Sequence, residues 1–598
     1  MATQILDTDA RHPFSLIGLA DRAWNTALEL SIHATRGPLA RGAEAMVLSV
    51  MRNIAAGQLR ISTPRETFDF PSLASRTECV NGVPSSESDP VKAEIRVRSD
   101  AFWIRLCLMG DLGFSEAYMY GEVECDDLVS LFKIFLMNKS RLERLDSKFS
   151  YLFTLPQKLT SYRFLNTLSN SRSNISAHYD ISNEMFAGFL SQDMTYSCAI
   201  FADLDGDLRP TYPREVKTTR NRDGIVSLKP PFSLPSPPGS HSPSDSGLDS
   251  GVDISHTPSN DLGLSKTDVS EDLISRLEKS TQGRKNGEEN ELYLAQLRKL
   301  DHIIAKLKIP SDRPTRVLEI GSGWGSMSIR IAQKYPLATV DTLTLSSQQQ
   351  DLAQQRIAEQ GSGVASRITV HLMDYRAMPS EWEASFDRVV SVEMIEAVGK
   401  EFLEVYWRTI DWAMKPKDAV GVVQAITLPE ARFDTYLAEI DFIRKWELYT
   451  CRSLSVANLI VVFPGGLLPT VTLLLETLKA GSQGRLVVDS ISNIGPHYAR
   501  TLREWCQRFT AKFDSVIRPA LMKEYPHIMG EERPDRDMKK AAEEIDVFKR
   551  KWIYYYCYCE VGFTTRTLGE RRAEVSRADH IMTFAREGYW AYGCDVYN

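Results

Sequence analysis

The sequence predicts an α/β protein whose main domain is a doubly wound parallel sheet, preceded by a smaller domain of helices and a strand. From Pro314 onward, short apolar stretches alternate with amphipathic helical stretches through short connections, which is the pattern of a parallel sheet covered by helices. At the start of this region, residues 316–325 read as a buried strand, a glycine-rich turn and the beginning of a helix. A ligand of such a sheet binds at the carboxyl ends of its strands.

The front region, about 15–170, begins with a predicted helix over 44–55, in which apolar residues recur on one stripe. This stripe indicates either a helix that faces a core or a face that contacts a membrane. Residues 94–98 alternate like a strand, and 100–109 predict a further helix. A glycine-rich passage over 110–121 closes this unit.

Residues 221–290 differ in kind from their surroundings. They are rich in serine and proline and poor in aromatic and β-branched residues, so they cannot bury enough apolar surface to offset the entropy of ordering. We predict a disordered insertion here, joined to the front region by 171–220. A helix is predicted over 291–307, because leucines and isoleucines recur there on one helical face.

The region 291–598 forms the predicted main domain. Its elements alternate strand and helix from the glycine-rich turn onward. The predicted strands are 316–320, 340–345, 368–372, 386–392 and 419–426, and the predicted helices are 326–335, 347–360 and 401–414.

Composition restricts the class of function. The formal net charge of −7 argues against a nucleic-acid binder, because phosphate contacts need an excess of basic residues. Nine scattered cysteines suit a reducing compartment, and Cys557 and Cys559 are too close together for a usual zinc pair, so we expect no metal site. The N-terminus lacks the pattern of a signal peptide, and prolines and glycines interrupt the apolar run 459–475. We therefore expect a cytoplasmic protein that is soluble or peripheral to membranes.

The glycine-rich turn indicates the kind of ligand. Gly321, Gly323 and Gly325 alternate after Glu319 at the strand end, which lets the backbone turn tightly and lie close to a nucleotide-like ligand. The spacing differs from that of dinucleotide folds, and the turn lacks the lysine of a phosphate loop. This favours a neutral or cationic nucleoside such as S-adenosylmethionine over NAD or ATP.

Several stretches, in this order, resemble the cyclopropane-fatty-acid synthase and mycolic-acid methyltransferase family. The resemblance covers roughly 44–203 and 290–570, with the predicted insertion between them. The stretches that carry it are 178–186 with 193–199, 319–325, 343–349, 392–399, 463–466, 493–502 and 562–567.

The resemblance implies a Rossmann-like class I methyltransferase domain over 291–598. It also implies an N-terminal lipid-binding domain over 15–170, and cofactor-lid helices with a link over 171–220. The implied reaction moves a methylene group from S-adenosylmethionine to the cis double bond of an unsaturated phospholipid acyl chain at a membrane surface. Because an alkene is a poor nucleophile, the reaction needs a dry, apolar pocket. A bound bicarbonate ion would act as the general base, and the resemblance points to a homodimer.

The resemblance also assigns residues to the two parts of the site. Those matching the cofactor-binding positions are Tyr196, Ser197, Glu319, Gly321, Gly323, Gly325, Thr344, Gln349, Asp374 and Tyr375. Those matching the catalytic positions, which form the bicarbonate pocket, are Cys198, Glu396, Gln424, Ile426 and Tyr498.

Structural roles compete with some of these assignments. Cys198 could be a small buried apolar residue, Tyr498 a core residue with a satisfied hydroxyl, and Asp374 an ordinary cap. Glu396 stands between apolar neighbours, where an unpaired carboxylate is costly, which favours a functional role. His497 reads as structural. The aromatic stripe Trp552, Tyr556, Cys559 and Phe563 is more typical of a core than of an acyl channel.

The chain departs from the bacterial members of the family at two positions, where it resembles the longer plant-like and fungal-like members. Gln424 and Ala397 stand where those members commonly have histidine, and an amide donates a hydrogen bond but cannot take a proton. The stretch 447–462 is extra, and it is either a lineage-specific loop or a gene-model error; 569–581 raises the same question. Three functions stay open beside the synthase: a lipid methyltransferase that leaves a methyl branch, an enzyme that methylates a sphingoid base or an amine, and an inactive lipid-binding protein.

Overall fold

The computed structural model describes residues 38–71, 91–146, 182–208, 291–438, 442–443, 466–530, 532, 537–565 and 578–586. The chain divides into one compact unit, Met1–Leu204 with Gly287–Asn598, and a second over Asp205–Asn286. Of the second unit, only 205–208 are described. The predicted insertion at 221–290 and the extra stretch at 447–462 therefore lie outside the described residues.

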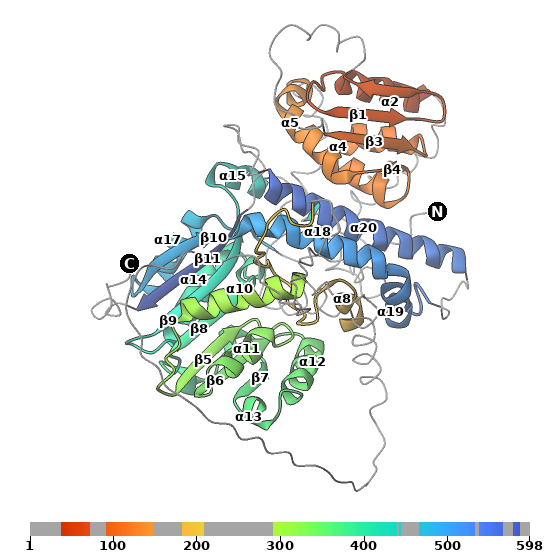
Figure 1. Ribbon diagram of the computed structural model, residues 1–598. Helices are drawn as coiled ribbons and strands as arrows, with labels where there is room; N and C mark the ends of the chain where they lie inside the picture. Colours follow the sequence, from red (N-terminus) through yellow and green to blue (C-terminus); the bar gives the residue numbers. More distant parts are fainter. Residues whose placement is uncertain are drawn as a thin grey trace, which may run out of the picture. The chain divides into compact units, whose positions relative to one another are not determined.

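A seven-stranded sheet in the order β10-β11-β9-β8-β5-β6-β7 forms the centre of the main domain (Figure 1). Its parallel strands are β5 (Thr315–Ile320), β6 (Ala338–Thr344), β7 (Ile368–Leu372), β8 (Arg388–Val392) and β9 (Val420–Thr427). All five were predicted, with boundaries that differ by no more than a few residues. The fold class, a doubly wound Rossmann-like sheet, is confirmed.

Two further strands complete this sheet and were not predicted. β11 (Ala578–Arg586) pairs antiparallel with β9 on one side and with β10 (Leu486–Asn493) on the other. The stretch 569–581 was predicted to be either a lineage-specific loop or a gene-model error. Its last residues, 578–581, are the start of an inner strand. The remainder of that stretch lies outside the described residues.

The order of the strands determines where the ligand crevice of the sheet lies. From β5 the chain adds β6 and β7 on one side and then returns to add β8 and β9 on the other. The switch point therefore lies between β5 and β8, whose carboxyl ends carry the glycine-rich turn and the segment that begins at Glu393. In doubly wound sheets, this crevice is where ligands bind.

Helices flank the sheet, and the helix prediction at 291–307 is confirmed as α10 (Glu291–Leu307). The helices described in this domain are α8 (Asn183–Phe189), α10, α11 (Ser326–Lys334), α12 (Ser347–Ala358), α13 (Ser362–Ala365), α14 (Leu403–Ala413), α15 (Glu430–Ala438), α17 (Val471–Ser482), α18 (Gly495–Lys512), α19 (Arg518–Glu524) and α20 (Met538–Thr564). Buried residues of α14 and α17 share one core with strand residues such as Leu318, Val389 and Phe584. This packing fixes the strand ends that form the site.

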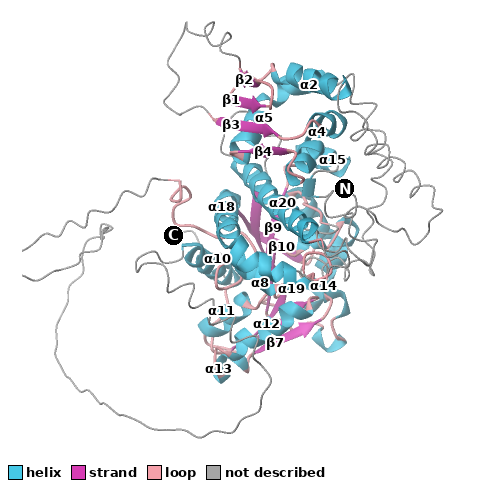
Figure 2. Cartoon of the chain, turned by 90° about the vertical axis from the view of Figure 1, so that its right-hand side faces the viewer, coloured by secondary structure: helices cyan, strands magenta, loops and turns pink. Residues whose placement is uncertain are grey.

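The front region contains a four-stranded sheet in the order β2-β1-β3-β4. Its strands are β1 (Gln58–Ser62), β2 (Thr67–Phe70), β3 (Lys92–Val97) and β4 (Val123–Cys125), and its helices are α2 (Pro38–Met51), α4 (Ala101–Met119) and α5 (Leu128–Asp146) (Figure 2). A domain of helices and one strand was predicted. β3 confirms the predicted strand at 94–98, whereas β1, β2 and β4 were not predicted.

The glycine-rich passage at 110–121 was wrongly predicted to close that unit. Helix α4 continues through most of it to Met119, and Gly110 with φ 57° and ψ −129° forms a kink inside the helix. Gly110 meets no neighbouring atom within 4 Å of an added Cβ, so the kink comes from its own backbone rather than from a close approach. A glycine bends a helix here without ending it.

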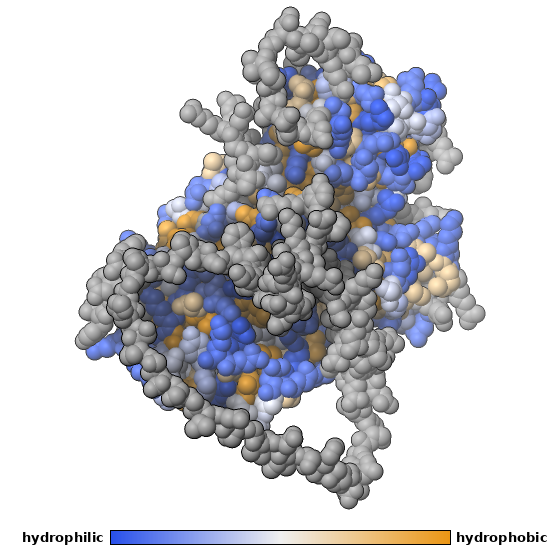
Figure 3. Space-filling view, viewed as in Figure 1, coloured by the Kyte–Doolittle hydropathy of each residue, from blue (hydrophilic) through white to orange (hydrophobic). Residues whose placement is uncertain are grey.

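None of the described helices combines the length and apolar character needed to cross a bilayer. On the face shown in Figure 3, polar residues cover much of the described surface, with apolar areas between them.

Candidate active site

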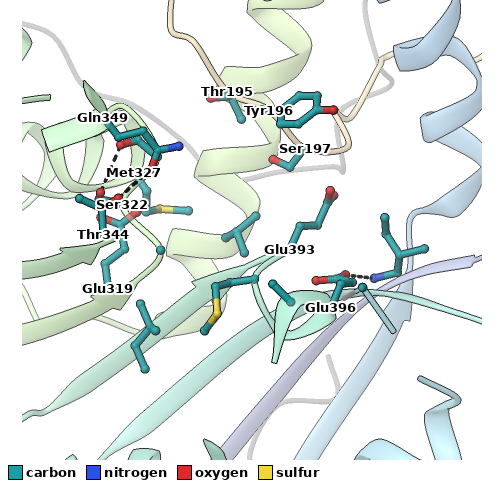
Figure 4. A pocket seen from close by; sticks show the side chains of 18 of the residues that line it. Thr195, Tyr196, Ser197, Glu319, Ser322, Met327, Thr344, Gln349, Glu393 and Glu396 are labelled. Atoms are coloured by element: carbon teal, nitrogen blue, oxygen red, sulfur yellow. Dashed lines mark hydrogen bonds between the residues drawn. The ribbon is translucent and has the colours of Figure 1, made fainter. Parts of the chain in front are cut away.

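A pocket opens at the carboxyl ends of the central strands (Figure 4). Figure 4 shows Glu319, Thr344 and Gln349 on one side, Glu393 and Glu396 on the other, and Tyr196 with Ser197 above them. The residues that line the pocket include Tyr196, Ser197, Glu319, Gly321, Gly323, Thr344, Gln349, Asp374, Tyr375, Glu393, Met394, Glu396, Val398, Ile426, Leu468, Tyr498, Leu502, Cys559 and Phe563. Predicted residues that are not among the lining residues are Cys198, Gly325 and Gln424.

The glycine-rich turn forms the floor next to β5. Gly321, Gly323 and Gly325 have φ values of 97°, 47° and 85°, which a residue with a side chain rarely adopts. A Cβ on Gly321 would lie 3.3 Å from the Met394 side chain, whereas one on Gly323 would meet nothing within 4 Å. Gly323 therefore presents bare backbone to the pocket. Gly325 instead caps α11 and faces Ala353, so its part is to shape the turn.

Glu319 lies buried beneath this turn. Ser328 donates a hydrogen bond to its carboxylate, and burial raises the pKa of Glu319 to about 7. The positive charge of Lys299 opposes this shift. Lys299 itself donates a hydrogen bond to Ser197 Oγ over 2.7 Å. The buried Lys299 thus donates to Ser197 and acts on Glu319 through its charge.

Thr344 and Gln349 form the polar wall after β6. Thr344 Oγ1 donates to Gln349 Oε1 over 2.8 Å (Figure 4). Ser346 caps α12 by accepting from the backbone N–H of Gln349, which fixes the side of the helix that faces the pocket. Thr344 and Gln349, two of the predicted cofactor-binding residues, thus lie together on the pocket wall.

Asp374 and Tyr375 follow β7. The Asp374 carboxylate accepts from Arg376 Nε over 2.9 Å and from Nη2 over 2.6 Å, and it also caps the short helix at 375–377. The interpretation of Asp374 as a cap is therefore correct, and cofactor binding by the same side chain stays a prediction. Burial raises the pKa of Tyr375, whose ring meets Tyr406 edge-on at 5.5 Å.

Tyr196 packs in an aromatic cluster above the pocket. Its ring centroid lies 5.5 Å from that of Phe186 and 5.1 Å from that of Trp505. These contacts come from α8 and α18, so the 194–197 segment is held between two helices. The predicted lid position is consistent with this placement.

Two carboxylates occupy the other end of the pocket. Glu396 accepts a hydrogen bond from the backbone N–H of Ile426 over 2.6 Å at Oε1, while its Oε2 has no hydrogen-bond partner among the described residues. Burial and the negative charge of Glu393 raise the pKa of Glu396 to about 8. Glu396 is therefore largely protonated at neutral pH.

Glu393 is the functional candidate that the sequence analysis missed. Its Oε1 accepts from the backbone N–H of Cys198 over 2.8 Å and from Gln424 Nε2 over 2.7 Å, and its Oε2 accepts from the Tyr498 hydroxyl over 2.7 Å. The residue takes the left-handed φ of 48°. Both glutamates lie in the stretch 392–399, which is one of those that resemble the family. Only Glu396 matched a family position, so Glu393 was not assigned a role.

The five predicted catalytic residues thus come together, but around the carboxylates of the chain itself. Cys198 contributes its backbone N–H, and its buried thiol faces the carbonyls of Ala199 and Ile494. Cys198, Gln424 and Tyr498 donate to Glu393, and Ile426 donates to Glu396. Because these donors already bind carboxylates, the residues present do not fit a bicarbonate ion.

The aromatic stripe of α20 divides between core and pocket. Trp552 and Tyr556 pack with Phe189 in the core, as predicted. Cys559 and Phe563 are buried as well, but they also line the pocket, and Phe563 stacks on Tyr498 at 4.6 Å. His497, predicted to be structural, accepts from the backbone N–H of Phe201 and does not line the pocket.

A family model described as mycolic acid cyclopropane synthetase matches residues 166–222 and 270–527. Among curated proteins, the chain is 27% identical over 529 residues to the tuberculostearic acid methyltransferase UfaA1 of Mycobacterium tuberculosis, covering 88% of this chain and 90% of that protein. It is 25% identical over 489 residues to the cyclopropane-fatty-acyl-phospholipid synthase of Escherichia coli, covering 81% and 88%. Among solved structures, the cyclopropane synthase MmaA2 from Mycobacterium tuberculosis matches with a TM-score of 0.40 and 19% identity, covering 69% of this chain and 98% of that one.

Proposed function

Because the chain belongs to the mycolic acid cyclopropane synthetase family of S-adenosylmethionine-dependent methyltransferases, we propose that it is a cyclopropane synthase acting on phospholipids. Its substrate would be the cis double bond of an unsaturated acyl chain, reached at a membrane surface. The similarity to the Escherichia coli synthase over 81% of this chain supports the phospholipid substrate. In this proposal, the front domain holds the lipid and the main domain carries out the chemistry.

One observation carries the proposal: a single pocket joins the glycine-rich turn after β5 to the carboxylates after β8. The bare backbone at Gly323 and the polar pair Thr344 and Gln349 fit a nucleoside. When bound, S-adenosylmethionine supplies a methyl group on a positively charged sulfur. Glu319 and the turn would hold its methionine end, and Thr344 with Gln349 its ribose.

The opposite wall suits an acyl chain. Val398, Leu468, Leu502 and Phe563 line it, and such side chains exclude water from a reacting alkene. A cation formed on the acyl chain would then persist until a base removes a proton. Glu393 is placed at this wall with its carboxylate held by three donors. A negative charge fixed there stabilises the developing positive charge.

A second candidate is a methyltransferase that leaves a branch on the acyl chain. The similarity to the tuberculostearic acid methyltransferase over 88% of this chain favours it. In this case, the hydrogen on the methylated carbon moves with its electron pair to the neighbouring cationic carbon. Loss of a proton from the former methyl group then leaves a methylene branch. Both outcomes need a base at the same carbon, so the pocket serves either product.

The deciding experiment uses purified protein with S-adenosylmethionine and vesicles of monounsaturated phospholipid. Mass spectrometry of the fatty acids detects a product heavier by one CH₂ group, and proton NMR distinguishes ring protons from a methylene branch. Ring signals support the synthase, and branch signals support the second candidate. Cofactor binding without a lipid product would contradict both and point to a sphingoid base or an amine. Absence of cofactor binding would point to an inactive lipid-binding protein.

A further inference from the structure

Three hydrogen-bond donors from distant parts of the chain converge on the carboxylate of Glu393. The backbone N–H of Cys198 comes from the 194–198 segment, the Gln424 amide from β9, and the Tyr498 hydroxyl from α18, all within 2.8 Å. Hydrogen bonds to an ionised carboxylate stabilise that form. The arrangement therefore holds a negative charge at a fixed point on the pocket wall.

We propose that the Glu393 carboxylate is the general base of this enzyme and stands where a bicarbonate ion would otherwise bind, so that turnover needs no bicarbonate. This inference rests on the proposed function, because it assigns a residue to the proton transfer of that reaction. In this mechanism, a side chain that the fold holds in place acts instead of an external ion.

The ring closure and proton transfer need no further reactant. After the methyl group has been added to the alkene, the neighbouring carbon is cationic. The electron pair of one C–H bond of the new methyl group forms the second bond to that carbon and closes the ring. The released proton passes to Glu393, whose carboxylate becomes a neutral carboxylic acid. Release of that proton to water after the product leaves restores the base.

Glu396 is the less suitable base of the two. It is 8% exposed and accepts a hydrogen bond from the backbone N–H of Ile426. The charge of Glu393 lies beside it, and two neighbouring carboxylates do not both ionise readily. Glu396 therefore serves as the neutral partner, and Glu393 carries the charge.

The backbone at Glu393 supports a role for its side chain. A φ of 48° is uncommon for a residue with a side chain, and such conformations persist where the surrounding structure holds them, often at functional sites. Glycine adopts this conformation without strain. Glu393→Gly should therefore keep the fold while opening the space between the three donors.

The test compares wild type with Glu393→Gly and Glu393→Gln, and uses Asp418→Gly as a matched control. Asp418 is also acidic, has a φ of 60° and is exposed outside the pocket, so this variant controls for an acid-to-glycine change at left-handed backbone. Each protein is assayed in carbonate-free buffer, with and without added bicarbonate, using S-adenosylmethionine and monounsaturated phospholipid vesicles. Binding of ¹³C-labelled bicarbonate is followed separately by NMR on the S-adenosylhomocysteine complex.

We expect wild type and Asp418→Gly to be equally active in both buffers and to bind no bicarbonate. Glu393→Gln should lose about 10²-fold or more in kcat, the scale of one lost general base, with no recovery on adding bicarbonate. Glu393→Gly should lose a similar factor but bind bicarbonate and recover at least about tenfold with it, because the vacated donors can hold the ion.

Two results would overturn the inference: wild type that binds bicarbonate and needs it for turnover, or a Glu393→Gln variant as active as wild type. Failure of the proposed function looks different. In that case, no lipid product forms in either buffer, while the NMR measurement still reports whether Glu393 excludes bicarbonate from the donors.

Discussion

Tyr498 donates its hydroxyl hydrogen bond to Oε2 of Glu393 over 2.7 Å, although 105 positions of sequence separate the two residues. The bond links the first turn of α18 to the segment that follows β8. Tyr498 also stacks on Phe563 of α20 at 4.6 Å. Its ring is therefore held by packing, and its hydroxyl is directed at the Glu393 carboxylate.

Removing that hydroxyl should affect turnover more than folding. Tyr498→Phe keeps the stacking on Phe563, so we expect a small change in Tm, but Glu393 loses one of its three donors. We expect kcat to fall by about tenfold to a hundredfold, with the Kd for S-adenosylhomocysteine within about twofold of wild type. Steady-state kinetics and calorimetry measure the two quantities. An unchanged kcat would exclude Tyr498 from positioning the carboxylate.

Ionisation of Glu396 should limit activity at high pH. Because its pKa is raised to about 8 by burial and by Glu393, a second negative charge appears in the pocket only as the pH rises through that value. We expect kcat to decrease there. Glu396→Gln imitates the protonated form, so its activity should stay level over the same range. A decrease of equal size in both proteins would assign the high-pH limb to another group.

Glu319 should make the stability depend on pH. Its pKa in the folded state is about 7, above the ordinary 4.5, so the unfolded state releases this proton first as the pH rises. The free energy of unfolding should therefore fall between about pH 4.5 and 7, by on the order of 1–3 kcal/mol. Urea denaturation of wild type and Glu319→Gln measures the difference, and the variant should lack this part of the decrease. Parallel curves for the two proteins would contradict the assignment.

Gly323→Ala tests the cofactor end of the pocket. The added Cβ would meet no protein atom within 4 Å, so it would project into the space that the nucleoside needs. We expect the affinity for S-adenosylhomocysteine to fall by about tenfold or more. Gly361→Ala is the matched control, since Gly361 also has a positive φ of 84°, has open space around it and lies outside the pocket. Equal loss in both variants would mean that backbone strain, not the pocket, is responsible.

Local patterns in the sequence were sufficient for the parallel strands and most of the helices. The strand at 368–372 and the helix at 291–307 were predicted with the boundaries that the structure has. Each depends on the periodicity of its own side chains, which is a property of neighbouring residues. The glycine-rich turn is local in the same sense, because positive φ values demand glycine wherever the chain turns this way.

The antiparallel strands were missed because their signals are long-range. β10 alternates buried and exposed positions only in part, and β11 follows a 27-residue helix. Neither strand is defined until β11 pairs with β9, at positions such as Ile581 opposite Gln424. Pairing across so many residues depends on the packed core, which the sequence pattern of a single segment does not contain.

The sequence by itself determined the five parallel strands of the sheet, the glycine-rich turn after β5 and the family to which the chain is related. Only the tertiary structure decided which of two nearby glutamates receives the donors. Glu393 and Glu396 are three positions apart, but Cys198, Gln424 and Tyr498 all donate to the first. Which of two neighbouring carboxylates carries a charge depends on the donors and charges that surround each one in space. Folding brings these groups together from distant parts of the chain.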